Sequence, residues 1–324
     1  MDSQKASLNR RELLTATGAS LAVLALSGCR QGALSAVSTS RGRRVLRLAH
    51  LTDIHLLSSL NAPAGFTAAL RHVHAQKDRP DLIVTGGDHI MDSLEKNDAD
   101  TSEQWSLYHE IMQRECPTPV KSCIGNHDIW GWDQQKSQTT GDEPLWGKKR
   151  AVHELRLPHR YYSFDQAGWH FVILDSTYQV DGSNFVAKLD DEQFGWLGRD
   201  LKNNPRPTCI VSHEPILSAS VFLWAEIRRG QRQISASMMH TDAVQLKDLF
   251  KQHPQVKLCL SGHLHLVDRV DYTDVTYLCN GAVCGAWWHG DNKDCDEGYA
   301  LVDLYADGSV SHQYVSYGWN PKQA

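Results

Sequence analysis

Residues that commonly bind metal ions recur in this sequence in short, closely spaced groups. They are Asp53, His55, Asp88, Asn126, His213, His263 and His265. Asp53 and His55 are two positions apart, as are His263 and His265, so each pair points to one side of an extended segment. Seven such ligands exceed the needs of one ion with about four to six ligands, and they suit two ions sharing one carboxylate. We therefore expect a two-metal centre.

Each group of ligands follows an apolar run that has the character of a buried strand. These runs cover residues 45–51, 82–85, 119–124, 208–212 and 256–260. Polar groups just past the carboxyl ends of strands are where open α/β sheets place their chemistry. Glycines precede Asp88, Asn126 and His263, where the backbone must turn sharply beneath the ions. The five runs therefore predict five strands that deliver ligands to one edge.

The remaining pattern alternates helices with strands. Helical spacing of apolar residues predicts helices over 63–75, 98–114, 190–201 and 241–250. Residues 160–164 and 169–174 predict a hairpin, and further strands are expected over 275–279, 299–304 and 311–316. Residues 129–157 break the pattern and predict a long loop beside the site. The expected fold is α/β, a four-layer α-β-β-α sandwich of two mixed sheets flanked by helices.

Composition narrows the class of partner. The chain has 324 residues, of which 41% are hydrophobic and 22% charged, and its formal net charge is −5. With this net negative charge the chain has no basic stripe for a nucleic acid, so we expect no stable nucleic-acid partner. A small phosphorylated substrate held by metal is compatible with the charge. No second linker follows residue 44, so we expect one domain over 44–318 and a short tail over 319–324.

The first 29 residues have the character of an export signal. Arg10 and Arg11 precede a weakly apolar run over 16–26, which resembles the twin-arginine signal of bacteria. Leu26-Ser27-Gly28-Cys29 resembles a lipobox, in which Cys29 is lipidated; the alternative is an ordinary cleaved signal with a chance cysteine. Residues 30–43 predict a flexible tether. We expect an exported, periplasmic or otherwise extracytoplasmic protein, with Cys29 as a candidate membrane anchor.

The ordered motifs resemble those of the calcineurin-like metallophosphoesterases. Asp-x-His, Gly-Gly-Asp, Gly-Asn-His-Asp, a single His and Gly-His-x-His occur in that order after the tether. The resemblance implies the four-layer fold and an assignment of ligands. One ion is held by Asp53, His55 and His265, the other by Asn126, His213 and His263, with Asp88 between them. The donor set accepts Mn, Fe, Zn or Co.

The resemblance also implies roles for the two residues after Asn126. His127 acts as general acid toward the leaving oxygen during attack by a metal-activated hydroxide, and Asp128 orients the ring of His127. Position 91 is Met, where purple acid phosphatases carry a metal-binding Tyr. The first motif, with His55 in its third position, favours the cyclic-nucleotide phosphodiesterase-like and general phosphoesterase branches.

Aromatic residues near the motifs are candidates for substrate binding. Trp287, Trp288 and His289 follow a run of small residues, and Trp130 follows the Gly-Asn-His-Asp motif. They are suited to stack on a base or sugar, although core packing explains Trp residues equally well. Among the cysteines, those at 279, 284 and 295 are the candidate set for a disulfide.

The function expected from these observations is hydrolysis of phosphomonoesters or phosphodiesters of small, nucleotide-like molecules. Two alternatives stay open. One is a nuclease or a phospholipid-head-group phosphodiesterase, which a membrane tether mildly favours. The other is an inactive binding or sensor protein, which the intact set of ligands and His127 disfavours.

Overall fold

The computed structural model of this chain describes residues 42–319. The predicted export signal, Cys29, most of the tether and most of the tail lie outside these residues. Within the described part, β1 begins at Arg44 and the last strand, β15, ends at Ser316. Among the described residues, no helix combines the length and the hydrophobicity of a membrane span.

The first sheet has five strands in the order β15-β14-β1-β2-β3. Their bounds are Arg44–Leu51 for β1, Leu82–Thr85 for β2, Val120–Ser122 for β3, Gly298–Tyr305 for β14 and Val310–Ser316 for β15. β1, β2 and β3 are parallel, whereas β14 is antiparallel to both β1 and β15. The sheet is therefore mixed, and the carboxyl ends of its three parallel strands share one edge.

The second sheet has six strands in the order β12-β13-β11-β8-β5-β4. Their bounds are Tyr162–Gln166 for β4, Trp169–Ile173 for β5, Thr208–Val211 for β8, Val256–Ser261 for β11, Asp268–Tyr272 for β12 and Val275–Cys279 for β13. The four central strands are parallel, and the hairpin of β4 and β5 adds an antiparallel edge as predicted.

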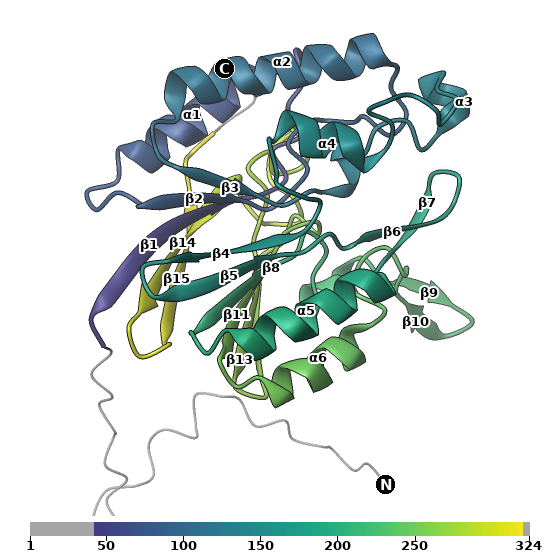
Figure 1. Cartoon of the computed structure of the whole chain (residues 1–324). Coiled ribbons are helices and arrows are strands. Elements are labelled where there is room, and N and C mark those ends of the chain that lie inside the picture. The colour runs from purple at the N-terminus through teal and green to yellow at the C-terminus, as the bar shows by residue number, and fades with distance from the viewer. Residues whose placement is uncertain (1–41, 320–324) are drawn as a thin grey trace, which may run out of the picture. The chain divides into compact units, whose positions relative to one another are not determined.

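Helices cover the outer face of each sheet (Figure 1). The first sheet is covered by α1 (Ala62–His74) and α2 (Asp98–Glu115), and the second by α5 (Asp191–Asn203) and α6 (Ala243–Gln252). Alternation along β1 explains the layering. Leu46 and Leu48 face the core between the sheets, whereas Ala49 and Leu51 face the core beneath α1 and α2. The predicted four-layer fold is confirmed.

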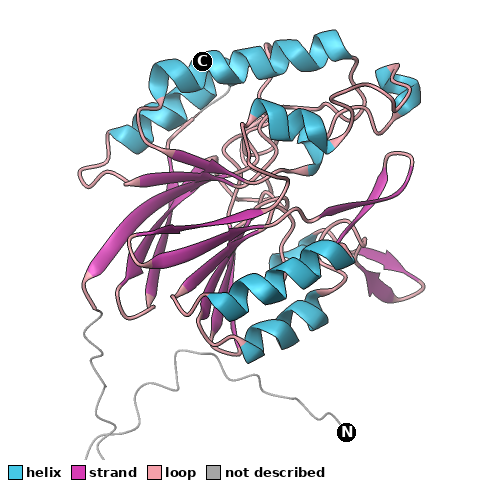
Figure 2. Cartoon of the chain, viewed as in Figure 1, coloured by secondary structure: helices cyan, strands magenta, loops and turns pink. Residues whose placement is uncertain are grey.

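Several short elements depart from the predicted pattern (Figure 2). Residues 129–157 are not one long loop, because they contain α3 (Gln134–Ser137) and α4 (Lys148–Glu154). Two hairpins also have no counterpart in the prediction, β6 (Thr177–Asp181) with β7 (Asn184–Ala187) and β9 (Glu226–Arg228) with β10 (Gln231–Gln233). These segments are short and mostly polar, so hydrophobic periodicity gives them no signal.

The cysteines are reduced throughout the described residues. Cys279, Cys284 and Cys295 are all free thiols, so this candidate set forms no disulfide in the structure. Cys279 and Cys284 are buried and pack as small apolar side chains.

Helix α1 packs closely against the loop after β13, in the core beneath α1 and α2. Gly65 of α1 lies against the indole of Trp288, and a Cβ atom at position 65 would come within 2.2 Å of Trp288 Cζ3. The ring of Trp288 is enclosed in the same core as Phe66 and Trp105. Only a residue without a side chain fits here.

We predict that Gly65→Ala lowers the free energy of unfolding by about 1–3 kcal/mol, because the added methyl overpacks a filled core. Gly198→Ala in α5 is the matched control. Its Cβ would meet Leu249 Cδ1 at an ordinary 3.8 Å, so we expect it to be neutral or stabilising. Chemical denaturation of both variants checks this, and equal stability of the two would contradict the packing argument.

Candidate metal centre and active site

The seven predicted ligands converge at one edge of the two sheets. Asp53 and His55 follow β1, Asp88 follows β2, and the others follow β3, β8 and β11. Six of the seven are buried, and His263 is partly buried. The parallel strands bring their carboxyl ends together, so residues far apart in sequence meet in one cluster.

The first trio lies within direct contact distance. His55 Nε2 is 3.1 Å from His265 Nε2, and Asp53 Oδ1 is 3.3 Å from His265 Nε2 and 3.9 Å from His55 Nε2. Three donor atoms therefore face a common point. This is the set that the family resemblance assigns to one ion.

The second trio surrounds His213. His213 Nε2 lies 3.2 Å from Asn126 Oδ1 and 3.3 Å from His263 Nδ1. Asp88 Oδ2 is 3.1 Å from His213 Nε2 and 3.5 Å from His55 Nε2. One carboxylate oxygen of Asp88 thus faces both trios, which is the position required of a shared ligand.

Backbone carbonyls fix the orientation of two ligand rings. Nδ1–H of His213 donates to the carbonyl oxygen of Gly86 at 2.8 Å, and Nδ1–H of His265 donates to that of Gly285 at 2.6 Å. A carbonyl only accepts, so Nδ1 keeps its proton in each ring and Nε2 is the nitrogen left to face the cluster as a possible ligand. Thr52 Oγ1–H also donates to Asp53 Oδ2 at 2.7 Å. The donors are oriented before any ion binds.

The backbone beneath the cluster is held in an unusual conformation. Positive φ angles occur at Asp53 (55°), His55 (45°), Asp88 (54°), His263 (68°) and His265 (53°). Side chains other than glycine disfavour this left-handed region, and such strain concentrates at functional sites. Five of the seven ligands therefore stand on strained residues that the rest of the fold must hold in place.

Charge in the cluster is balanced between carboxylates and imidazoles. Burial acts to raise the pKa of Asp53, but the charge and hydrogen bond of His265 hold it below the usual carboxyl range. Burial likewise opposes ionisation of Asp88, yet His213 and His127 keep its pKa well below normal. Against the effect of burial, Asp88 raises the pKa of His213. The carboxylates are thus ionised and attract cations.

The donor set fits divalent metal ions. Pairs of imidazole nitrogens face each other at 3.1 Å and 3.3 Å, a spacing that requires a proton or another cation between their lone pairs. Burial and the charge of His127 lower the pKa of His55, and burial and His213 lower that of His263, so both rings favour the neutral, ligating form. His55, Asp88, His213 and His263 also belong to compact groups with metal-site spacing.

His127 stands at the rim of the cluster. Its ring lies edge-on to that of His55, with 4.7 Å between the ring centroids, and its backbone N–H donates to Asp88 Oδ1 at 2.8 Å. Nδ1–H of His127 donates to the carbonyl oxygen of Met91 at 2.6 Å. Nε2 is therefore the nitrogen that is free to exchange a proton with a substrate.

Asp128 does not orient the ring of His127, so that part of the prediction is wrong. Its carboxylate turns back and accepts from the backbone N–H groups of Asp88, His89 and Gly125 at 2.8–3.0 Å, and it also contacts His89 Nδ1 at 2.9 Å. An Asp at the end of a short turn readily takes this capping position. Asp128 is a buried clamp on the backbone that carries Asp88.

The predicted substrate residues separate into two groups. Trp287 is half-buried beside the cluster, with ring centroids 4.5 Å from His265 and 6.0 Å from His55. Its neighbour Trp288 is only 1% exposed, packs in the core and donates from Nε1–H to the carbonyl of His55. Trp288 therefore supports the site from behind and does not line it. His289 is exposed.

Trp130 is also packed inside the structure. It is buried, its Nε1–H donates to the carbonyl oxygen of Lys96 at 3.1 Å, and Arg150 lies over its ring. These contacts tie the segment after His127 to the loop after β2. The prediction that Trp130 binds substrate is replaced by a packing role.

Some contributors to the site carry no signal in the sequence. The carbonyl groups of Met91, Gly86 and Gly285 orient imidazoles through main-chain atoms, which any residue type supplies. Cys284 is grouped with His55 and His265 by distance, and its Sγ is 3.9 Å from His265 Nδ1. Thr52 could have been proposed as a contributor from the sequence, because it stands next to Asp53.

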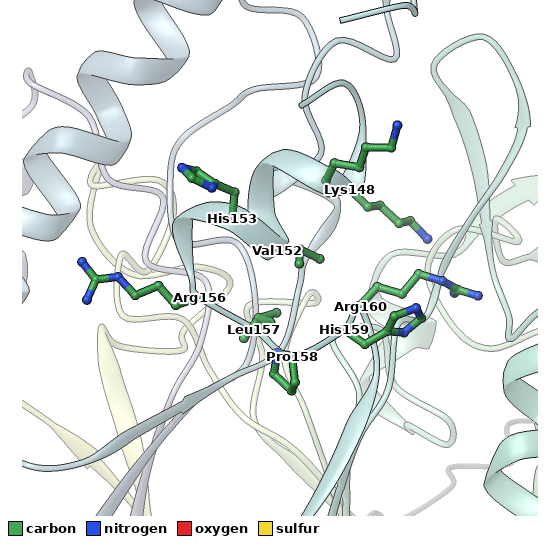
Figure 3. A pocket seen from close by; sticks show the side chains of 9 residues that line it. Lys148, Val152, His153, Arg156, Leu157, Pro158, His159 and Arg160 are labelled. Carbon is green, nitrogen blue, oxygen red and sulfur yellow. The ribbon is translucent and has the colours of Figure 1, made fainter. Parts of the chain in front are cut away.

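A separate concavity of about 590 Å³ lies along α4 (Figure 3). It is lined by side chains from residues 148–160, including His153, Arg156 and His159, and by none of the seven ligands. Two of its cations, Lys148 and Arg160, are already paired with Asp175. This concavity is distinct from the metal centre.

The position of Asp128 leads to a prediction about metal retention. Asp128→Asn removes one acceptor and turns an amide toward buried N–H groups, so we expect the free energy of unfolding to fall by about 2 kcal/mol or more. Because the clamp holds Asp88, metal content measured by elemental analysis should fall as well. Retention of all metal with a selective loss of turnover would instead support a role in orienting His127.

Comparison with known proteins identifies relatives of this fold and site. The sequence pattern of the calcineurin-like phosphoesterases matches residues 46–267. A 3′,5′-cyclic-nucleotide phosphodiesterase from Nostoc sp. is 28% identical over 280 residues, covering 82% of this chain and 90% of the relative. A 3′,5′-cyclic adenosine monophosphate phosphodiesterase from Haemophilus influenzae is 24% identical over 282 residues, covering 82% and 88%.

A solved structure shows the same fold. A dimetal phosphatase from Danio rerio superposes with a TM-score of 0.61 at 14% identity, covering 85% of this chain and 97% of that one. The family pattern spans more than half of the chain and includes every block of predicted ligands. The chain therefore belongs to the calcineurin-like phosphoesterase family and is a metal-dependent hydrolase of phosphoric esters.

Proposed function

We propose that this protein hydrolyses phosphodiesters of small, nucleotide-like molecules, with 3′,5′-cyclic nucleotides as the first class to test. The observation that carries the proposal is the buried double trio around Asp88, with His127 and Trp287 at its rim. Two relatives that align along most of their length are named as cyclic-nucleotide phosphodiesterases. The formal net charge of −5 speaks against a long nucleic acid as the main substrate.

In this proposal each trio would hold one divalent ion. Asp53, His55 and His265 would hold one ion, and Asn126, His213 and His263 the other, with Asp88 between them. When bound, such ions activate a water molecule and neutralise charge on the phosphoryl oxygens. The set of His, Asp and Asn donors is compatible with Mn, Fe, Zn or Co.

His127 is placed to handle the proton of the leaving group. Met91 holds Nδ1–H, so a proton added to His127 resides on Nε2 and can pass to the departing oxygen. The backbone N–H of His127 is also bound to Asp88, which fixes the imidazole relative to the shared carboxylate. Proton donation of this kind contributes typically 10²–10⁴-fold to a rate.

Trp287 offers a surface for the organic part of the substrate. Its ring lies 4.5 Å from that of His265 between centroids and the residue is partly exposed, which makes it the candidate stacking surface beside the reacting centre. Base stacking on an aromatic ring tolerates different bases, which suits a nucleotide-like substrate without requiring a particular base.

We further propose that the protein is exported and anchored through a lipidated Cys29. The support is in the sequence alone: the paired Arg10 and Arg11, the apolar run over 16–26, and the small residues before Cys29.

We predict that His127→Ala lowers kcat by about 10²–10⁴-fold on a substrate with a poor leaving group, such as a 3′,5′-cyclic nucleotide. The loss should be much smaller on bis-p-nitrophenyl phosphate, because nitrophenolate leaves without a proton. Metal content should be unchanged, since His127 is outside both trios. An equal loss on both substrates would contradict the general-acid role.

Asp88→Ala is the contrasting variant. Because Asp88 faces both trios, we expect it to lose metal and activity on both substrates. Elemental analysis of the two purified variants, with turnover measured after Mn²⁺ addition, checks this. Full metal content in Asp88→Ala would contradict the shared position of this carboxylate.

A further inference from the structure

A projecting segment from Ser220 to Gln233 lies apart from the sheets. It consists of a helical turn, η3 (Ser220–Leu223), followed by the hairpin of β9 and β10. Figure 1 shows this hairpin extending at the edge of the domain, beyond the helices α5 and α6. The metal centre uses none of its residues.

The segment exposes three large apolar side chains. Phe222 is 50% exposed, Leu223 61% and Ile227 64%. Single exposed apolar residues are ordinary on protein surfaces, but three on one short projecting element form a local concentration. Exposed apolar patches are candidate sites for contact with a partner protein or a membrane.

Arginines accompany these side chains. Ile227 is the cross-strand partner of Arg232, so both lie on one face of the hairpin. Arg232 Nη1–H also donates to the backbone carbonyl oxygen of Phe222 at 3.3 Å, which links the hairpin to the helical turn. Arg229 occupies the turn itself, with Gly230. Residues 226–233 contain three arginines and one glutamate, and that Glu226 pairs with Arg228.

The base of the segment is firmly anchored. Val221 is buried in a cluster with Leu264, and Trp224 Nε1–H donates to the carbonyl oxygen of Leu264 at 3.0 Å. The backbone N–H of Ser220 donates to Asp268 at 2.6 Å. The exposed side chains are therefore held outward by a fixed base. Leu264 lies between the metal ligands His263 and His265, so the base contacts the loop of the metal centre directly.

We propose that residues 220–233 form an interfacial element that binds the surface of an anionic lipid bilayer. Apolar side chains beside arginines are suited to the boundary where acyl chains meet phosphate groups. A two-fold contact between the hairpins of two copies would bring the arginines against each other, so charge favours lipid over a second copy. The proposal goes beyond phosphoester hydrolysis and does not rest on it. Its consequence is a metal centre held near the lipid surface.

The test is co-sedimentation of the metal-loaded full chain with vesicles. One set contains phosphatidylcholine with phosphatidylglycerol, and the other contains phosphatidylcholine alone. The variants are Phe222→Ser/Leu223→Ser/Ile227→Ser and Arg229→Gln/Arg232→Gln. The matched control is Leu60→Ser/Val244→Ser/Tyr272→Ser, which removes as many exposed apolar side chains elsewhere. All proteins share the same N-terminal residues, so any binding through that part is common to them.

We expect wild type and control to bind anionic vesicles equally well. The apolar variant should bind roughly ten-fold or more weakly, and the arginine variant roughly 25-fold more weakly, at about five-fold per arginine. Hydrolysis of bis-p-nitrophenyl phosphate and thermal stability should match wild type in every variant, which separates lost docking from misfolding.

Equal vesicle binding by wild type and both hairpin variants would overturn the proposal. So would a change from dimer to monomer in analytical ultracentrifugation of the apolar variant without lipid, because that result assigns the exposed face to a second copy.

Discussion

The structure depends on the burial of ionised carboxylates and imidazoles around Asp88. One oxygen of this residue approaches both His55 and His213, and two pairs of imidazole nitrogens face each other across the same space. Buried polar groups at such distances are stable only when cations balance their charge and lone pairs. The cluster therefore favours the binding of cations.

The surrounding fold holds the ligands in place although the backbone of several of them is strained. Five ligands have left-handed backbone angles, and each costs free energy that the rest of the molecule must offset. Burial of the hydrophobic cores and specific polar contacts behind the ligands offset this cost. Asp128 binds three backbone N–H groups under the loops of the site, and Trp288 donates to the carbonyl of His55 from within the core. In front of these supports, His127, His263 and Trp287 are partly exposed.

Much of the fold could be predicted because its signals are periodic. The spacing of Phe66, Leu70 and Val73 indicated α1, and apolar runs indicated the strands that carry the ligands. The ligands after the different strands, including Asp53 and His55, could be assigned to one site. The reason is that parallel strands end at a common edge of the sheet.

Other features could not be predicted because they arise from tertiary contacts. Trp287 and Trp288 are adjacent and chemically alike, yet one lies beside His265 and the other is in the core. Likewise, Asp128 follows His127 but caps a backbone turn, and only the folded chain shows that Met91 supplies the contact to the His127 ring. The β9–β10 hairpin is short and rich in Arg and Gln, so its sequence lacks the alternation of a strand.

The most direct test of the two-metal account is metal content measured together with turnover. The purified protein is analysed for metal by elemental analysis, and its hydrolysis of bis-p-nitrophenyl phosphate is measured after chelation and after restoration of Mn²⁺. The account predicts about two ions per chain, loss of activity on chelation and recovery with metal. Folded protein that binds no metal specifically, or that remains fully active after chelation, would contradict it.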